Sequence, residues 1–277
     1  MVGMCRLFGF KSAVLSRAHR SLVEAENALS AQAKVHPDGW GIAWFQGGQA
    51  WVVKSEQGAS DSESFRRASA HLASNTMIAH VRRATVGSNA PNNTHPFRCG
   101  RWVFAHNGTL FGFDRLRDSL HADLPAPLRL NILGSTDTET LFHWLLAQLV
   151  AAGLDLTQTP DAAAVLPVLR GARDRLLARA AAEGCPSPVI NYLLTDGHLF
   201  IAQRYGRELW MATQKRLCRD AETCTWADKI CLLPVRPGNR LNHLLVASEQ
   251  IGDEDRWEEV AEGAILAVGD DLRLLAG

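Results

Sequence analysis

The stretch Trp40-Gly-Ile-Ala-Trp-Phe-Gln-Gly-Gly-Gln-Ala-Trp-Val-Val-Lys54 holds two apolar segments on either side of the pair Gly47-Gly48. Segments rich in aromatic and β-branched residues are typical of strands, and two glycines between them are typical of a tight hairpin turn. The same pattern recurs where Val189–Thr195 and His198–Gln203 flank Asp196-Gly197. Because hairpins join antiparallel strands, the chain is not expected to form a doubly wound parallel sheet.

Other strand-like segments lie in both halves of the chain, and helical patterns separate the two groups. No repeat or low-complexity linker marks a domain boundary. We therefore expect a single α+β domain of two antiparallel sheets with helices packed outside them. The remaining strands are predicted at Cys5–Phe10, Met77–Arg82, Trp102–Ala105, His243–Ser248, Ala264–Val268 and Leu272–Leu275, and the helices at Ala18–Ala33, Thr138–Val150 and Ala162–Ala182.

Length and composition limit the classes of function. The chain has 277 residues, 47% hydrophobic and 21% charged, which is ordinary for a globular protein. Lys plus Arg equal Asp plus Glu at 29 each, so no net charge favours nucleic acid or an acidic membrane surface. The sequence shows no long apolar run and no secretory signal, and we expect a cytoplasmic protein with a small-molecule substrate.

The cysteines point to nucleophilic chemistry at one position only. Six cysteines are sparse for this length and lack the tight pairs of a zinc site, so Cys218, Cys224 and Cys231 are expected to be structural, with no metal or other cofactor. Cys5 differs, because removal of residues 1–4 would put a thiol and a free α-amine on one residue. That amine, with an ordinary pKa of about 7.7 to 8.0, can serve as the thiol's general base. The alternative is a small apolar cysteine packed in the first strand.

Two further segments put polar groups where strands end. In Ala79-His-Val-Arg-Arg-Ala-Thr85, His80 and Arg82 share one strand face, so we expect Arg82 to enter a pocket, where its guanidinium can hold a carboxylate in a paired contact. The strand from Trp102 is expected to end at Asn107-Gly108. A side-chain amide beside a backbone N–H can form an oxyanion hole, although Asn-Gly is also typical of a plain tight turn.

A third segment, Gly134-Ser-Thr-Asp-Thr-Glu-Thr140, opens a predicted helix. Thr136 and Glu139 have the spacing of a capping box, which is a sufficient structural reason for both. Asp137 lies in the first helical turn, where the helix dipole stabilises a carboxylate. An ionised carboxylate at that position can also bind an ammonium group.

Taken together, a nucleophile, an oxyanion hole, a carboxylate clamp and an ammonium clamp suit an α-amino acid presented through its side-chain acyl group. The ordered motifs resemble those of the class II glutamine amidotransferases, members of the N-terminal nucleophile (Ntn) hydrolases, in their short single-domain branch. The motifs are Cys5-Arg-Leu-Phe-Gly, Asp38-Gly-Trp-Gly-Ile-Ala-Trp, His80-Val-Arg-x-Ala-Thr-x-Gly, His95-Pro-Phe, His106-Asn-Gly-Thr-Leu and Thr136-Asp-Thr-Glu.

The resemblance implies a four-layer α/β/β/α sandwich of two antiparallel sheets. It implies Cys5 as nucleophile with its α-amine as base, Asn107 and Gly108 as the oxyanion hole, and Arg82 and Asp137 as the residues that bind the α-carboxylate and α-amine of the substrate. Thr85 and His106 complete the predicted substrate-binding set. Because the terminal amine is the base, structural hydrogen bonding is the expected role of the motif histidines, which are His36, His80, His95 and His106.

The chain also departs from the family. It has Arg83 and Val86 where sugar-phosphate-type members have Trp and His, so contacts of their closing loop are not carried over. The expected domain is 5–277, and residues 1–4 are expected to be absent from the mature chain, either as a removed leader or because translation starts at Met4. Three functions stay open: a γ-glutamyl amide hydrolase that acts alone, a glutaminase subunit that supplies ammonia to a separate synthase, and a catalytically silent γ-glutamyl-binding homologue.

Overall fold

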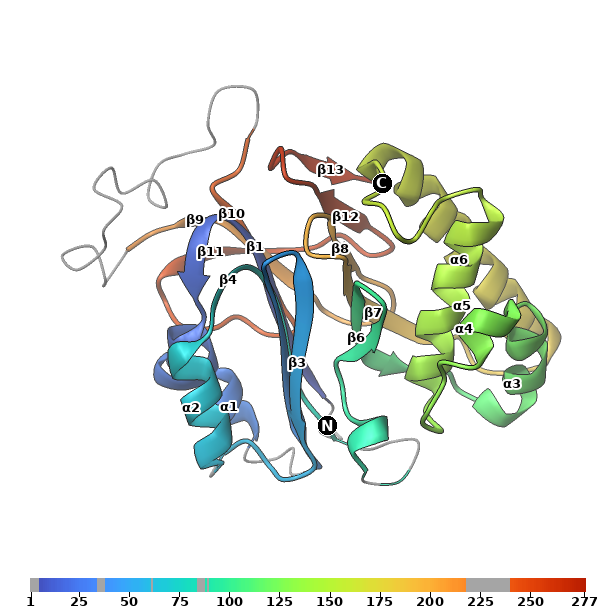
Figure 1. Ribbon diagram of the computed structural model, residues 1–277, viewed down its shortest axis with the longest axis horizontal. Coiled ribbons are helices and arrows are strands. Elements are labelled where there is room, and N and C mark those ends of the chain that lie inside the picture. Colours follow the sequence, from blue (N-terminus) through green and yellow to red (C-terminus); the bar gives the residue numbers. More distant parts are fainter. Residues whose placement is uncertain (1–4, 34–37, 61, 84–87, 89, 218–239) are drawn as a thin grey trace.

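The computed structural model describes residues 5–33, 38–60, 62–83, 88, 90–217 and 240–277, and its strands form two antiparallel sheets that face each other (Figure 1). In the described part of the chain, the first sheet has seven strands in the order β11-β9-β10-β1-β4-β2-β3. These strands are β11 (Asp255–Glu259), β9 (Trp210–Lys215), β10 (His243–Ala247), β1 (Arg6–Arg17), β4 (Ala73–Val81), β2 (Trp40–Gln46) and β3 (Gln49–Ser55).

The second sheet has six strands among the described residues, in the order β13-β12-β8-β7-β6-β5. Each sheet takes strands from both halves of the sequence, so the chain crosses between the sheets after β4, after β8 and after β11. The strands of the second sheet are β13 (Leu274–Ala276), β12 (Ile265–Val268), β8 (Phe200–Gln203), β7 (Val189–Thr195), β6 (Trp102–Thr109) and β5 (Phe97–Cys99).

Helices cover the outer face of each sheet (Figure 1). α1 (Leu29–Gln32) and α2 (Glu63–His71) pack on the first sheet, and α3 (Phe113–Ala122), α4 (Ala126–Arg129), α5 (Asp137–Ala151) and α6 (Ala162–Ala182) cover the second. The arrangement confirms the expected four-layer α/β/β/α sandwich. No helix within the described ranges has both the length and the apolar character needed to cross a membrane.

Alternation along the strands separates an inner core from two outer cores. On β1, Leu7 lies in the core between the sheets, whereas Phe8 lies in the core under α1 and α2. On β4, Ile78 faces the second sheet and Val81 faces the helices. His80 therefore lies on the inner face, as its strand position predicted.

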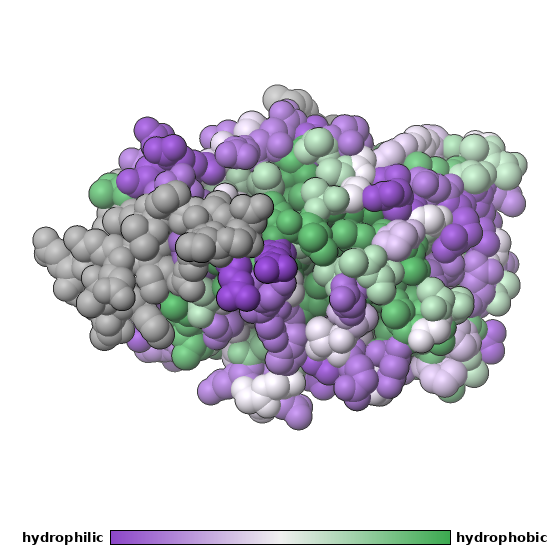
Figure 2. Space-filling view, turned by 90° about the horizontal axis from the view of Figure 1, so that it is seen from above, coloured by the Kyte–Doolittle hydropathy of each residue, from purple (hydrophilic) through white to green (hydrophobic). Residues whose placement is uncertain are grey.

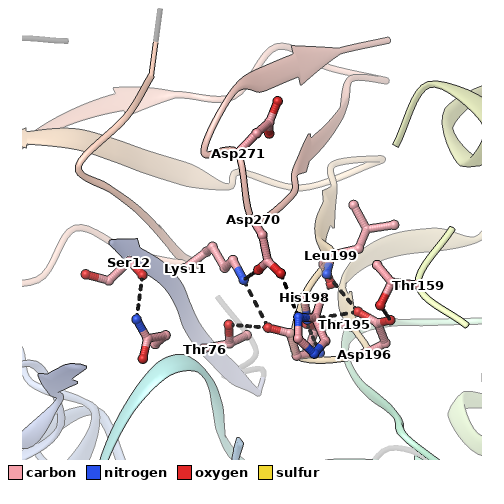
Figure 3. Close-up of polar contacts among 12 residues, drawn as sticks. Lys11, Ser12, Thr76, Thr159, Thr195, Asp196, His198, Leu199, Asp270 and Asp271 are labelled. Atoms are coloured by element: carbon pink, nitrogen blue, oxygen red, sulfur yellow. Dashed lines mark hydrogen bonds and ion pairs between the residues drawn. The ribbon is translucent and has the colours of Figure 1, made fainter. Parts of the chain in front are cut away.

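The hairpins differ in how well the local sequence predicts them. Gly47 (φ 60°) and Gly48 (φ 72°) form the expected two-residue turn, with Gln46 opposite Gln49. Asp196-Gly197 does not form a two-residue turn, because Thr195 pairs with Phe200 across a four-residue loop. The Asp196 carboxylate accepts hydrogen bonds from two amides inside that loop, at His198 (3.0 Å) and Leu199 (2.7 Å), and so stabilises the longer form (Figure 3).

The helix expected over Ala18–Ala33 is wrong. The structure has a π-helical turn at Arg20–Glu24 and the short α1 at Leu29–Gln32. Between them Asn27 has a positive φ of 58°, which ends a helix, and its side-chain amide donates to the Gln250 carbonyl (2.9 Å). A tertiary contact thus breaks a segment whose apolar spacing favours one helix.

The end of the sandwich away from Cys5 is held by a polar cluster (Figure 3). The buried Lys11 ammonium donates to the Gly197 carbonyl (3.0 Å) and to Asp270 (2.6 Å), and the other Asp270 oxygen lies 2.6 Å from His198 Nδ1. A cavity of about 360 Å³ lies beside this cluster and does not include the predicted site residues. In the view from above, a band of hydrophobic residues crosses the middle of the molecule, with hydrophilic residues around it and one strongly hydrophilic group near the centre (Figure 2).

Candidate active site

Cys5 lies directly before β1, with its thiol against the backbone that follows β4. Sγ is 3.2 Å from both the Arg83 amide, which donates to it, and the Arg83 carbonyl, to which the thiol donates. Burial raises the pKa of the Cys5 thiol, the Arg83 amide and the Arg82 charge oppose that rise, and Asp137 adds to it. The thiol therefore needs a base to become a nucleophile at neutral pH.

Arg82 follows the last residue of β4 and is only 3% exposed. Its backbone is fixed by a hydrogen bond from its amide to the Gly39 carbonyl (2.8 Å), and its guanidinium donates to the Ser88 carbonyl (3.3 Å). Burial lowers the pKa of Arg82, and the charges of Cys5, Asp38 and Asp137 raise it. The predicted carboxylate clamp is thus a buried cation within electrostatic reach of the nucleophile.

Asn107 and Gly108 lie inside β6 and not in a turn, because β6 continues to Thr109 and pairs with β7 throughout. Asn107 points between the sheets, is 4% exposed, and has a buried Oδ1 with no hydrogen-bond partner in the described structure. An unsatisfied buried acceptor typically costs about 1 to 3 kcal/mol, and only a ligand that donates to Oδ1 would relieve it. An oxyanion would instead accept from Nδ2 of the same amide.

The backbone of Gly108 is placed for an oxyanion hole. Gly108 is opposite Ile190 of β7. The Ile190 N–H points away from β6, toward the β8 side, and donates to the Tyr205 carbonyl (2.8 Å). Antiparallel pairs alternate between bonded and non-bonded, so the Gly108 N–H points to the other side of β6, beyond the end of β5. A Cβ at Gly108 would lie 2.0 Å from the Val189 carbonyl, so packing also requires glycine here.

Asp137 is the first residue of α5 and fastens that helix to the end of β6. Its carboxylate accepts hydrogen bonds from the amides of Leu110 and Thr138, both at 2.8 Å. The predicted capping box forms only in part: Thr136 accepts from the Glu139 amide (3.2 Å). The Glu139 carboxylate instead accepts from the amides of residues 133 and 134, because the loop before α5 folds back over it.

His106 joins β6 to α5 from the outer face of the second sheet. Its Nε2 donates to the Val189 carbonyl (2.9 Å), so neutral Nδ1 accepts from the Thr138 hydroxyl (3.0 Å). Burial lowers the pKa of His106, and Asp137 opposes that shift. Both ring nitrogens have partners inside the protein, which agrees with a structural hydrogen-bonding role, and a contact of His106 with substrate stays a prediction.

Asn93 is a positioning residue that the sequence reasoning missed. Its Nδ2 donates to the Ser88 carbonyl (3.0 Å), the same oxygen that Arg82 uses, and its Oδ1 accepts from the Ser135 amide (2.9 Å). Asn93 thus links the segment after Arg82 to the segment before Asp137. No local feature of the sequence indicates this role.

Several predicted positions lie outside the residues that the structure describes: Thr85, His36, Val86, the cysteines at 218, 224 and 231, and residues 1–4. Within the described ranges, no group of three His, Cys, Asp or Glu side chains is arranged to hold a metal ion. The predicted residues that are described, which are Cys5, Arg82, His106, Asn107, Gly108 and Asp137, all gather at one end of the sandwich.

The relatives found by comparison with known proteins include a named hydrolase and a putative glutamine amidotransferase. The protein of Mycobacterium tuberculosis named gamma-glutamyl-hercynylcysteine sulfoxide hydrolase is 26% identical over 236 residues, which cover 84% of this chain and 76% of that protein. YafJ of Escherichia coli is 32% identical over 173 residues, and the match covers 60% of each protein, so the chain matches less than two thirds of that relative.

The fold agrees with these relatives. A solved glutamine aminotransferase class-II domain protein from Silicibacter pomeroyi superposes with a TM-score of 0.64 at 19% identity, over 99% of this chain and 98% of the other. The sequence model of the class II glutamine amidotransferases matches residues 4–273, nearly the whole chain. The chain therefore belongs to the class II glutamine amidotransferases and is an enzyme of that family.

Proposed function

We propose that this chain is an N-terminal-cysteine amidohydrolase that cleaves the γ-glutamyl amide bond of glutamine or of a γ-glutamyl conjugate. The observation that carries the proposal is the place of Cys5 Sγ, which lies 3.2 Å from the Arg83 backbone, next to the buried cation Arg82 and within electrostatic reach of Asp137. A cation and an anion near one nucleophile suit the carboxylate and ammonium of one α-amino acid.

The proposed chemistry begins when Cys5 Sγ attacks the γ-carbonyl carbon. Its proton passes to the Cys5 α-amine, which is free only in a chain that begins at Cys5, and from there to the leaving amine. The Gly108 N–H and the Asn107 side-chain amide hold the oxyanion. The C–N bond breaks to give a thioester and an amine, and water, activated by the same α-amine, then releases glutamate and restores the thiol.

The M. tuberculosis relative, whose match covers 84% of this chain, is named a hydrolase, and this name favours hydrolysis of a γ-glutamyl conjugate. A glutaminase subunit that feeds ammonia to a synthase is the alternative, and a small-molecule substrate is common to both. A catalytically silent homologue is the third possibility. The three differ in turnover by the isolated protein, which is directly measurable.

The test is hydrolysis of glutamine and several γ-glutamyl amides by purified protein that begins at Cys5, with Cys5→Ala as the control. We expect the isolated protein to release glutamate from at least one of these compounds, and Cys5→Ala to release none. Turnover that needs an added synthase would support the subunit alternative. Binding of γ-glutamyl compounds without turnover would contradict an amidohydrolase.

A further inference from the structure

The order of the strands around Cys5 indicates how a bound γ-glutamyl substrate would be oriented. In the first sheet, β4 and β10 flank β1 on opposite sides, and in the second sheet β5 and β7 flank β6. Arg82, which follows β4, would hold the glutamyl α-carboxylate on one side of Cys5. A γ-glutamyl group bound there in an extended form would place its leaving amine on the opposite side, toward β10 and β7.

A loop that crosses from the second sheet to the first is hydrogen-bonded to β7 on that opposite side. It connects β8 to β9 and is held by Asn191, which is fully buried and stands opposite Asn107 in the β6–β7 pair. Asn191 Nδ2 donates to the carbonyls of Arg207 and Glu208, both at 3.1 Å, and its Oδ1 accepts from the Tyr205 amide (2.8 Å). The backbone of Arg207 is therefore fixed next to the strand that carries the predicted oxyanion hole.

Two arginines lie near this place. Arg6 directly follows Cys5, donates to the Cys5 carbonyl (3.4 Å) and forms an ion pair with Glu249. Arg207 is exposed and has no ion-pair partner among the residues with described positions. Partial burial and the nearby charge of Arg6 both lower the pKa of Arg207, so the two guanidinium groups lie within electrostatic reach of each other. Glu208, also exposed, is the acidic neighbour of Arg207 in this loop.

We propose that Arg207, supported by Arg6, forms a subsite for a carboxylate on the leaving amine, so that the preferred substrates are γ-glutamyl conjugates of α-amino acids. Arginine binds a carboxylate with two parallel N–H donors, and Arg6 already has Glu249, which leaves Arg207 as the residue that contacts the ligand. Ammonia, the leaving group of glutamine, has no carboxylate and cannot use this subsite. The inference rests on the proposed function and adds the substrate class to it.

The experiment compares three substrates: γ-glutamylglycine, γ-glutamylglycinamide and glutamine. The first two differ only in whether the leaving amine carries a carboxylate or a neutral amide. We expect wild-type protein to prefer γ-glutamylglycine in kcat/KM by about 10- to 100-fold, the usual worth of a hydrogen-bonded charge pair. Arg207→Gln should remove this preference and leave turnover of glycinamide and glutamine unchanged. Arg170→Gln, an exposed arginine on α6, is the matched control and should change nothing.

The outcomes separate the two proposals. Equal kcat/KM for γ-glutamylglycine and γ-glutamylglycinamide in the wild type, or a preference that Arg207→Gln leaves intact, would overturn the subsite while the amidohydrolase stands. Failure to hydrolyse any of the three substrates would overturn the amidohydrolase, and the subsite with it. Unchanged glutamine turnover in Arg207→Gln shows that this variant is folded.

Discussion

Replacement of Asp137 by Asn tests the clamp and the fold at the same position. The two carboxylate oxygens each accept a backbone amide, from Leu110 and from Thr138, at 2.8 Å. Asn keeps one acceptor but turns an NH₂ group toward the other amide, so one hydrogen bond is lost and two donors face each other. The change also removes the charge that a substrate ammonium would bind.

The expected loss of stability follows from these contacts. A hydrogen bond to a charged group contributes about 1.5 to 3 kcal/mol, and a carboxylate in the first helical turn about 0.3 to 1 kcal/mol. We therefore expect the free energy of unfolding to fall by roughly 2 to 4 kcal/mol. For a domain of this size that corresponds to a decrease in Tm of roughly 5 to 15 °C.

The assay measures unfolding in urea beside steady-state kinetics on a γ-glutamyl amide, at a temperature where the variant is folded. KM should rise about 10- to 100-fold with little change in kcat, because the ammonium is held in both ground and transition states. Glu139→Gln is the control: its buried carboxylate also accepts from two backbone amides, in the loop before the same helix, so stability should fall while KM changes little.

Two results would refute the reasoning about Asp137. Stability within 0.5 kcal/mol of wild type, roughly the size of an ordinary surface substitution, would mean that the two amide bonds are not formed as described. A clear loss of stability with an unchanged KM would mean that Asp137 only fastens α5 to β6, and the ammonium clamp would then lie elsewhere.

Three further predictions concern other residues. Asn107→Ala should lower kcat by about 10²- to 10³-fold, the usual loss for one oxyanion donor. Stability should change little, because the buried Oδ1 of Asn107 has no hydrogen-bond partner among the described residues. A fall in kcat of less than threefold would contradict the assignment. Gly108→Ala should lower the free energy of unfolding, measured in urea, by at least about 1 to 3 kcal/mol, because the new Cβ would lie 2.0 Å from the Val189 carbonyl oxygen. Unchanged stability would contradict the close approach of β6 and β7 at this position. Burial raises the pKa of Asp255 to about 6. Between about pH 4 and 6 the folded state therefore keeps a proton that the unfolded state has lost, and the stability that this proton contributes is lost as the pH rises through 6. Asp255→Asn removes that dependence, so its stability relative to wild type should rise by about 2 kcal/mol between pH 4 and pH 7. A flat difference across this range would refute the shift. The neighbouring His243, whose pKa burial lowers to about 4, acts in the opposite direction in both proteins.

Local sequence predicts the elements whose side chains repeat regularly. The Gly47-Gly48 hairpin and α6 agree with the expected positions, and α5 is one residue longer at each end than predicted. β11 was missed because its sequence, Asp-Arg-Trp-Glu-Glu, is that of a charged edge strand with little apolar alternation. The short β5, the strand β9 and the helices α2, α3 and α4 were missed as well.

Distant contacts account for the rest. Asn107-Gly108 has the local preference of a turn, but both residues pair with β7, opposite Asn191 and Ile190, and that pairing keeps them extended. The motifs identified the residues that carry charge or act as nucleophile. They did not identify Asn93 and Asn191, because each of these residues works by joining segments that are far apart in the sequence.

The central claim is that Cys5 is the nucleophile of a chain that begins at Cys5. The most direct measurement is reaction of the active protein with a glutamine analogue that carries an electrophile at the γ position, followed by peptide mass mapping. The account predicts one adduct, on Cys5 with a free α-amine, and protection by excess glutamate, whose carboxylate and ammonium Arg82 and Asp137 would bind. An adduct on Cys99 or Cys185, or an active labelled protein that retains residues 1–4, would contradict it.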